Sequence, residues 1–194
     1  MSIAESLSSF EPEPVKLSRF ARLIAFDQRL LRRLVQSRRA RATFLLRAVC
    51  RLYDPDMVIM AVAVALFHPA LVDVANRAGV ALAATSLLAY LVKRLVRRSR
   101  PHNELHASVP PDRYSFPSGH TAAAFSLAIA MFGSMPLLAP PLLLMAVVVG
   151  YGRMYLGVHY PLDVAAGAAI GLITGSVLAV LQFPQHALIA LPSF

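Results

Sequence analysis

Apolar residues along the chain form long runs separated by short polar segments. The runs lie at about residues 57–74, 75–96, 118–135, 141–155 and 161–183. Each approaches the roughly 20 residues that a helix needs to cross a bilayer core of about 30 Å. The pattern predicts five spanning helices, the first interrupted by His68-Pro69 and the last beginning at Pro161, a residue suited to a first helical turn.

The residues before the first run have a different pattern. Residues 1–16 are polar and contain Glu11-Pro12-Glu13-Pro14, which predicts a disordered tail and no cleavable signal peptide. Residues 17–52 mix aliphatic side chains with ten arginines, too many charges for a spanning helix. Helical spacing of the apolar residues favours amphipathic helices on an anionic membrane surface, with a solvated basic tail as the alternative.

Composition supports a membrane location. The 194 residues are 57% hydrophobic, the mean hydropathy is +0.60, and Trp is absent. We therefore expect an all-α, multi-pass transmembrane helical bundle at residues 53–184, followed by a C-terminal tail at 185–194. A sixth span between Arg41 and Leu52 is an alternative to interfacial helices. Cys50 is the only cysteine, so neither an intramolecular disulfide nor a cysteine-rich metal site can form.

The distribution of charge bears on the partner and on the orientation of the chain in the membrane. Net charge is +9, with eleven of the nineteen basic residues at positions 16–51 and six more at positions 93–113. These charges flank membrane-length apolar runs and lack interleaved aromatic residues, which disfavours nucleic acid as a partner and favours anionic lipid headgroups. The positive-inside rule places the N-terminal region in the cytoplasm, and two crossings return the chain there, whereas a sixth span would reverse this.

Three polar clusters lie at the ends of predicted spans, at residues 93–101, 114–121 and 152–163. Ionisable residues are costly inside lipid, so those retained beside spanning helices are candidates for function. The second and third spans are joined by the loop 99–117, which puts the first two clusters on one side of the membrane. The third and fourth spans return the chain to that side, so all three clusters can converge.

The combined residues suit binding of a phosphate group. Lys93, Arg100 and Arg153 can neutralise its oxygens, with arginine offering a planar fork of donors. Backbone N–H groups of Ser118 and Gly119, at a helix N-terminus, can donate to the same oxygens. We therefore predict a phosphate-binding site.

Two histidines can divide the chemistry of phosphate transfer between them. His159 is the expected nucleophile, because Asp163, four residues later, can accept from one ring nitrogen and leave the other free. His120 is the expected general acid. Each cluster alone also has a structural interpretation: a basic membrane anchor at 93–100, a helix cap at Ser118, and a hydrogen-bonded pair of His159 and Asp163.

The three clusters resemble the tripartite signature of the type 2 phosphatidic acid phosphatase superfamily, which includes bacterial acid phosphatases and vanadium haloperoxidases. Its motifs are K-x6-R-P, P-S-G-H and S-R-x5-H-x3-D. They correspond to Lys93 with Arg100-Pro101, then 117–120, then Arg153, His159 and Asp163. One departure is Gly152, where the family usually has serine. The resemblance implies a helical fold and a phosphohistidine intermediate, with no metal or other cofactor.

We therefore expect a lipid phosphate phosphatase in a bacterial inner membrane, with its site facing the cytosol. Candidate substrates are phosphatidic acid, phosphatidylglycerol phosphate, a polyprenyl phosphate or diphosphate, and a lipid A phosphate. A vanadate-dependent haloperoxidase and a non-catalytic scaffold for anionic lipids are the alternatives. Gly167, Gly171 and Gly175 form a small-residue stripe that permits close helix packing, and also a homo-oligomer contact.

Overall fold

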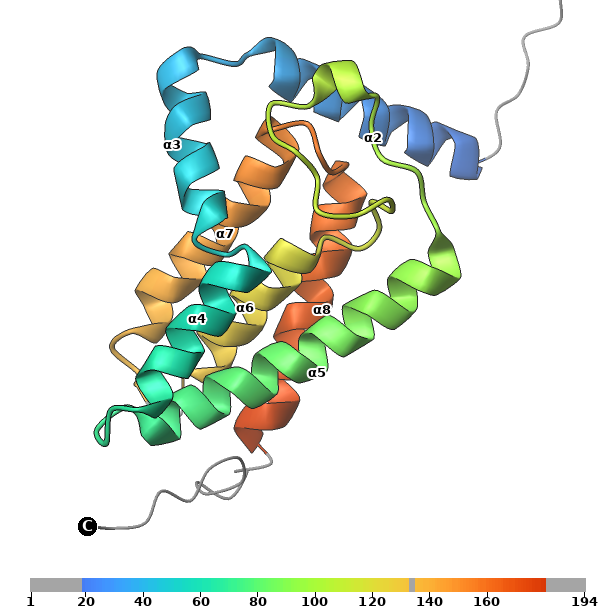
Figure 1. Cartoon of the computed structure of the whole chain (residues 1–194). Helices are drawn as coiled ribbons and strands as arrows, with labels where there is room; N and C mark the ends of the chain where they lie inside the picture. Colours follow the sequence, from blue (N-terminus) through green and yellow to red (C-terminus); the bar gives the residue numbers. More distant parts are fainter. Residues whose placement is uncertain (1–18, 133–134, 181–194) are drawn as a thin grey trace, which may run out of the picture.

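The computed structural model describes residues 19–132 and 135–180, which form seven α-helices and one short 3₁₀ turn (Figure 1). The helices are α2 (Arg19–Gln36), α3 (Ala40–Arg51), α4 (Pro55–Leu66), α5 (Val72–Val96), α6 (Gly119–Ala130), α7 (Ala139–Tyr155) and α8 (Pro161–Val180), and the turn is η1 (Asn103–Leu105). No strand occurs within these ranges, which confirms the predicted all-α fold. The proposed tails at 1–16 and 185–194 lie outside the described residues.

The observed helices follow the apolar runs, with one correction. The first predicted span was wrong in continuing to Val74, because α4 ends at Leu66 and α5 already begins at Val72. The turn between them contains His68-Pro69. Proline cannot donate an N–H to a helix and disfavours helical geometry in the residue before it, so the run breaks there. The last helix begins at Pro161, as predicted.

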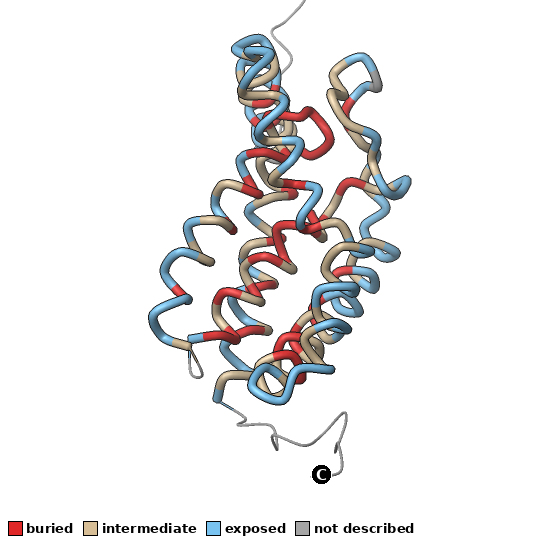
Figure 2. Tube along the Cα trace, turned by 60° about the vertical axis from the view of Figure 1, so that its left-hand side comes forward, coloured by how far each residue is buried: buried red, intermediate tan, exposed pale blue. Residues whose placement is uncertain are grey.

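Helix α6 lies at the centre of the bundle and packs against α5, α7 and α8. It is lined with small buried residues, including Ala122 and Ala128. Figure 2 shows that many of the buried positions lie in the middle of the bundle. The glycine stripe of α8 faces it: a Cβ at Gly171 would lie 2.3 Å from the backbone oxygen of Ala122. Buried Gly167 and Gly175 meet α6 in the same way. The stripe is therefore occupied within the chain, and the expected oligomer contact through it is wrong.

The outward faces of the bundle are apolar. Large hydrophobic side chains are exposed on α4, α5 and α8, among them Ile59, Val64, Leu87, Leu91 and Ile173. Two helices, α5 and α8, are long and apolar enough to cross a membrane by length and composition. Lipid is the solvent in which such outer surfaces are stable, so the fold indicates a membrane location.

The N-terminal helices pack on one end of this bundle. Helix α2 lies across the end where α7 joins α8, and α3 packs along α7 (Figure 1). Arg38, in the turn between α2 and α3, donates from Nε to the backbone oxygen of Tyr155 at 2.6 Å and from Nη2 to that of Leu105 at 2.6 Å. Helices α2 and α3 are therefore an integral part of the fold around the three polar clusters.

Candidate active site

Backbone hydrogen bonds join the three polar clusters at one end of the bundle. The Ser115 N–H donates to the oxygen of Arg98 at 2.8 Å, so the loop between α5 and α6 folds back on itself. The Ser118 N–H donates to the oxygen of Asp163 at 2.9 Å, which connects the starts of α6 and α8. The clusters that the sequence predicted to converge therefore lie together.

His159 is held between a cation and a carboxylate. Its Nε2 lies 3.2 Å from Nη1 of Arg100, and its Nδ1 lies 3.6 Å from Oδ2 of Asp163. The ring is 1% exposed, and its Nδ1 makes no hydrogen bond within the described residues. Burial, together with the charges of Arg153, Arg100 and Lys93, lowers the pKa of His159 well below its ordinary value of 6.5. The imidazole is therefore neutral at pH 7, the form in which it can act as a nucleophile.

Three cations surround this histidine. Arg100 and Lys93 both contact Asp112, whereas Arg153 is 3% exposed and has two nitrogens, Nε and Nη2, that make no hydrogen bond within the described residues. A buried guanidinium with unused donors is costly unless an anion is bound to it. This arrangement is suited to an anion with several oxygens, such as phosphate.

Asp112 pairs with two of these three cations. Its two carboxylate oxygens each accept a hydrogen bond at 2.7 Å, one from Nζ of Lys93 and the other from Nη2 of Arg100. Burial alone would raise the pKa of Asp112, but hydrogen bonds to these two cations outweigh it and lower the pKa. Asp112 is therefore a charged internal partner of Lys93 and Arg100, and an anion that binds to these two cations would compete with it.

The start of α6 supplies His120 and Gly119, which line the same cavity as His159. His120 is paired with Asp54, whose Oδ1 lies 2.6 Å from its Nε2. Gly119 is the first residue of α6, so its N–H has no acceptor within the helix, and nothing lies within 4 Å of the Cβ position. Ser118 does not fit its predicted role, because its N–H is already donated to Asp163 and its hydroxyl is bonded to Thr121.

The structure gives a steric reason for Gly152, which replaces the serine of the family motif. A Cβ at this position would lie 2.8 Å from Sγ of Cys50 and 3.6 Å from Cδ2 of Leu46. Both neighbours belong to α3, which packs directly against α7. A side chain at residue 152 would therefore require the Cys50 side chain to move.

A cavity of about 720 Å³ extends from these residues between α4 and α5. Lys93, Arg100, His120 and His159 lie at one end of it. The remainder is mostly apolar and includes Val58, Ile59, Val62, Leu66, Leu82 and Ala83. Its volume is within the usual range for sites that bind small molecules.

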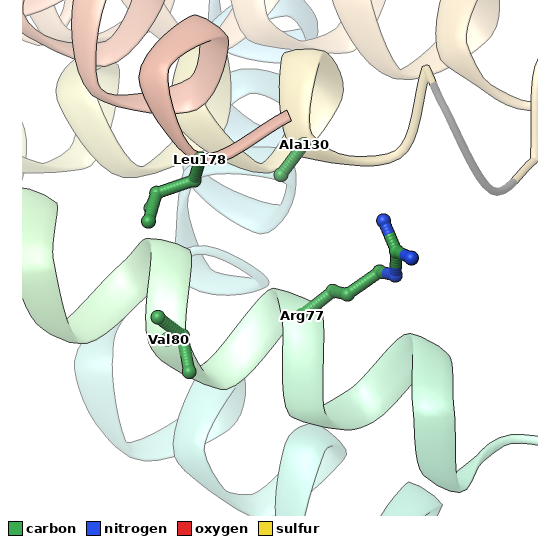
Figure 3. A pocket seen from close by; sticks show the side chains of 4 residues that line it. All are labelled: Arg77, Val80, Ala130 and Leu178. Atoms are coloured by element: carbon green, nitrogen blue, oxygen red, sulfur yellow. The ribbon is translucent and has the colours of Figure 1, made fainter. Parts of the chain in front are cut away.

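A second hollow is too small and too remote to compete with this cavity. It holds about 20 Å³ and is lined by Arg77, Val80, Ala130 and Leu178 (Figure 3), and neither His120 nor His159 lines it. That volume accommodates about one water molecule. We therefore do not include Arg77 among the candidate site residues.

Sequence reasoning missed three charged residues that contact the predicted set, Asp54, Arg98 and Asp112, and a fourth, Asp27, that pairs with Arg98. One signal was present, because Asp27 is the only acidic residue between positions 17 and 52. Arg98 was hidden within a run of basic residues, and Asp54 and Asp112 each follow or precede a proline turn. In the described part of the chain, no group of three or more His, Cys, Asp or Glu side chains could hold a metal ion.

The apolar outer faces indicate an all-α membrane protein, and a buried cationic cluster lies at one end of its bundle. The chain belongs to the PAP2 superfamily, whose sequence model matches residues 75–187.

Two solved structures share this fold. A transmembrane PAP2-type phosphatidylglycerolphosphate phosphatase from Bacillus subtilis superposes with a TM-score of 0.71 at 22% identity, covering 82% of this chain and 86% of that one. LpxE from Aquifex aeolicus gives a TM-score of 0.67 at 27% identity, covering 80% of this chain and 94% of that one.

Curated relatives match over about half of the chain. A decaprenylphosphoryl-5-phosphoribose phosphatase of Mycobacterium tuberculosis is 43% identical over 98 residues, which are 47% of this chain and 51% of the relative. An undecaprenyl-diphosphatase of Bacillus subtilis is 31% identical over 101 residues, 50% of this chain and 52% of the relative. The chain thus matches about half the length of these two relatives.

The lowered pKa of His159 predicts a dependence of stability on pH. Below pH 6.5 the unfolded chain binds a proton at this histidine while the folded chain does not. The free energy of unfolding therefore decreases as the pH is lowered from 6.5 toward the pKa of His159 in the folded chain. We expect wild-type protein to lose up to about 1.4 kcal/mol per pH unit more than His159→Asn in this window. Thermal unfolding midpoints in detergent, measured from pH 8 to pH 5, test this; parallel curves for the two proteins would contradict it.

Removal of this internal partner should strengthen anion binding. Asp112→Asn leaves Lys93 and Arg100 without a competing charge, so we expect inorganic phosphate to bind about threefold to tenfold more tightly. Isothermal titration calorimetry in detergent measures this, with Asp56→Asn as the control because Asp56 pairs with exposed Arg51 instead. Weaker binding by Asp112→Asn would show that the carboxylate supports the anion rather than competing with it.

Proposed function

We propose that this chain is an integral membrane phosphatase that hydrolyses a phosphomonoester or diphosphate on a lipid, without a metal ion and through a phosphohistidine intermediate. The observation that carries the proposal is the cavity between α4 and α5, which joins two histidines and two cations to a long apolar lining. A phosphate group suits the first end and a hydrocarbon tail suits the second. The two curated relatives, a decaprenylphosphoryl-5-phosphoribose phosphatase and an undecaprenyl-diphosphatase, support the same assignment.

In this proposal the cations hold the phosphate while its charge redistributes. Lys93 and Arg100 turn from Asp112 to the phosphate oxygens, and Arg153 donates from the nitrogens that are unused here. The Gly119 N–H adds a backbone donor at the positive end of α6. Fixed donors directed at the developing charge are the main source of catalysis in metal-free phosphoryl transfer.

The two histidines then divide the reaction between them: His159 accepts the phosphoryl group and His120 transfers the proton. The Nε2 lone pair of His159 attacks phosphorus, the bond from phosphorus to the lipid oxygen breaks, and His120 gives its proton to that oxygen. Water then attacks the phosphohistidine, His120 takes a proton from the water, and inorganic phosphate leaves. Asp163 faces Nδ1 of His159 and stabilises the positive charge that the ring gains. Asp54, whose Oδ1 lies 2.6 Å from Nε2 of His120, orients the ring of this general acid.

The apolar length of the cavity favours a substrate with a long tail. Val58, Val62 and Leu66 are spaced along one face of α4, and Leu82 and Ser86 face them from α5. The two curated relatives carry decaprenyl and undecaprenyl substrates in their names. Among the candidate lipids we therefore place polyprenyl phosphates and diphosphates, including phosphosugar derivatives, ahead of phosphatidic acid, phosphatidylglycerol phosphate and lipid A phosphates.

We further propose that α4 to α8 form five spans of a bacterial inner membrane, with α2 and α3 at the interface. Helix α2 lies at the same end of the bundle as the candidate site (Figure 1). Its side chains include Arg19, Arg22, Arg29, Arg32 and Arg33, suited to anionic headgroups. Because basic segments stay in the cytoplasm, the site faces the cytosol in this arrangement.

Lipid phosphate hydrolysis tests the proposed function directly. Purified protein in detergent should release phosphate from undecaprenyl diphosphate or a decaprenyl phosphosugar with a chelator present, because the site uses no metal. His159→Ala should lower the rate at least about a thousandfold by removing the nucleophile. His68→Ala is the matched control, since this exposed histidine lies in the α4–α5 turn. Absence of release from any of the candidate lipids, or full activity of His159→Ala, would refute the proposal.

Sidedness can be measured with a single introduced cysteine. Val109, in the loop beside the site, is 90% exposed, while the native Cys50 is buried. In intact cells Val109→Cys should react only with reagents that cross the membrane. Labelling by an impermeant maleimide would place the site outside and favour a sixth span.

A further inference from the structure

Asp27 is a buried carboxylate on a helix that otherwise carries positive charge. It lies in the middle of α2, is 1% exposed, and is the only acidic residue between positions 17 and 52. The phosphatase chemistry proposed for the site does not use it. A buried carboxylate costs free energy unless it is fully paired, so its contacts indicate why it is there.

Both oxygens of Asp27 contact the residues that surround Asp163. Oδ2 accepts a hydrogen bond from Nη2 of Arg98 at 2.6 Å, and Oδ1 accepts one from the backbone N–H of Leu162 at 2.9 Å. Leu162 is the second residue of α8, and its N–H has no acceptor within the helix. Asp27 therefore caps α8 from another helix, one residue before Asp163.

Arg98 connects the two carboxylates. Its Nη1 donates to Oδ1 of Asp163 at 2.8 Å while its Nη2 holds Asp27, and its guanidinium lies 4.1 Å from the centre of the Tyr160 ring. A planar guanidinium fixed at both nitrogens and on one face has little freedom to rotate. Lysine could not make these two directed contacts at once.

The remaining oxygen of Asp163 is the one that faces the candidate nucleophile. Oδ2 accepts from the backbone N–H of Tyr160 at 2.8 Å and lies 3.6 Å from Nδ1 of His159. With Oδ1 held by Arg98, the plane of the carboxylate is set, and so is the direction of Oδ2. The direction of this oxygen relative to His159 thus depends on a residue of α2.

We propose that Asp27 and Arg98 are positioning residues for the candidate active site: they orient the carboxylate of Asp163 toward His159 without touching the substrate. This inference rests on the proposed phosphatase function. It makes α2 part of the catalytic apparatus, in addition to its role at the membrane surface. Neither Asp27 nor Arg98 lines the cavity between α4 and α5, so their removal should affect turnover and leave substrate affinity unchanged.

Steady-state kinetics with a double-mutant cycle test this relay, the series of contacts from Asp27 through Arg98 to Asp163. Asp27→Asn should lower kcat about tenfold to a hundredfold with KM within twofold of wild type, as expected for the outer partner of an active histidine–carboxylate pair. Arg98→Gln should have a similar effect, and the double variant should be no slower than the slower single variant. Asp73→Asn, which removes a carboxylate at the opposite end of α5, should leave both constants unchanged.

The outcomes separate the relay from its alternatives. A kcat for folded Asp27→Asn within twofold of wild type, a raised KM, or additive losses in the double variant would each overturn it. Unfolding midpoints recorded for every variant distinguish loss of turnover from loss of protein, and Arg98→Gln interrupts the relay from its other end should Asp27→Asn not fold. An inactive wild type counts against the proposed function, whereas an active wild type with an equally active Asp27→Asn counts against the relay alone.

Discussion

Positive charges gathered in a small, poorly solvated volume repel one another, and the site end of this bundle contains Lys93, Arg98, Arg100 and Arg153. Removing such ions from water costs on the order of several kcal/mol each before partners are counted. Asp27, Asp112 and Asp163 compensate three of the four cations. Nε and Nη2 of Arg153 have no acceptor among the described residues, so this cluster has more cations than paired carboxylates. The same deficit that makes the site costly makes it suited to phosphate.

This charge cluster is assembled by close packing between α6 and α8. The three glycines of the α8 stripe allow α6 to approach until backbone atoms touch, which brings the first turns of both helices together. The bond between the Ser118 N–H and the Asp163 oxygen then joins the starts of the two helices. Bulky residues at the glycine positions would push α6 away from α8 and so separate His120 from His159.

Spacing and periodicity were sufficient to predict the all-α fold and the start of α8, because both depend on local sequence. The convergence of the three motifs followed from counting the crossings between them. The end of α4 was misplaced, since one proline outweighed an otherwise continuous apolar run. Asp54 and Asp112 were missed because their partners are 66 and 19 residues away, and no local pattern encodes such pairs. The roles assigned to His159, His120 and the phosphate-binding cations stay predictions. Ser118 was assigned as a donor from its cap position alone, without regard to competing acceptors.

The contact between Gly152 and Cys50 couples the third motif to the N-terminal helices. A Cβ at residue 152 would lie 2.8 Å from Sγ of Cys50 and 3.6 Å from Cδ2 of Leu46, so a serine there would require the Cys50 side chain to move. The residue next to Arg153 and the side chain at position 50 therefore form one packing unit, and redesign of either position has to treat the two together.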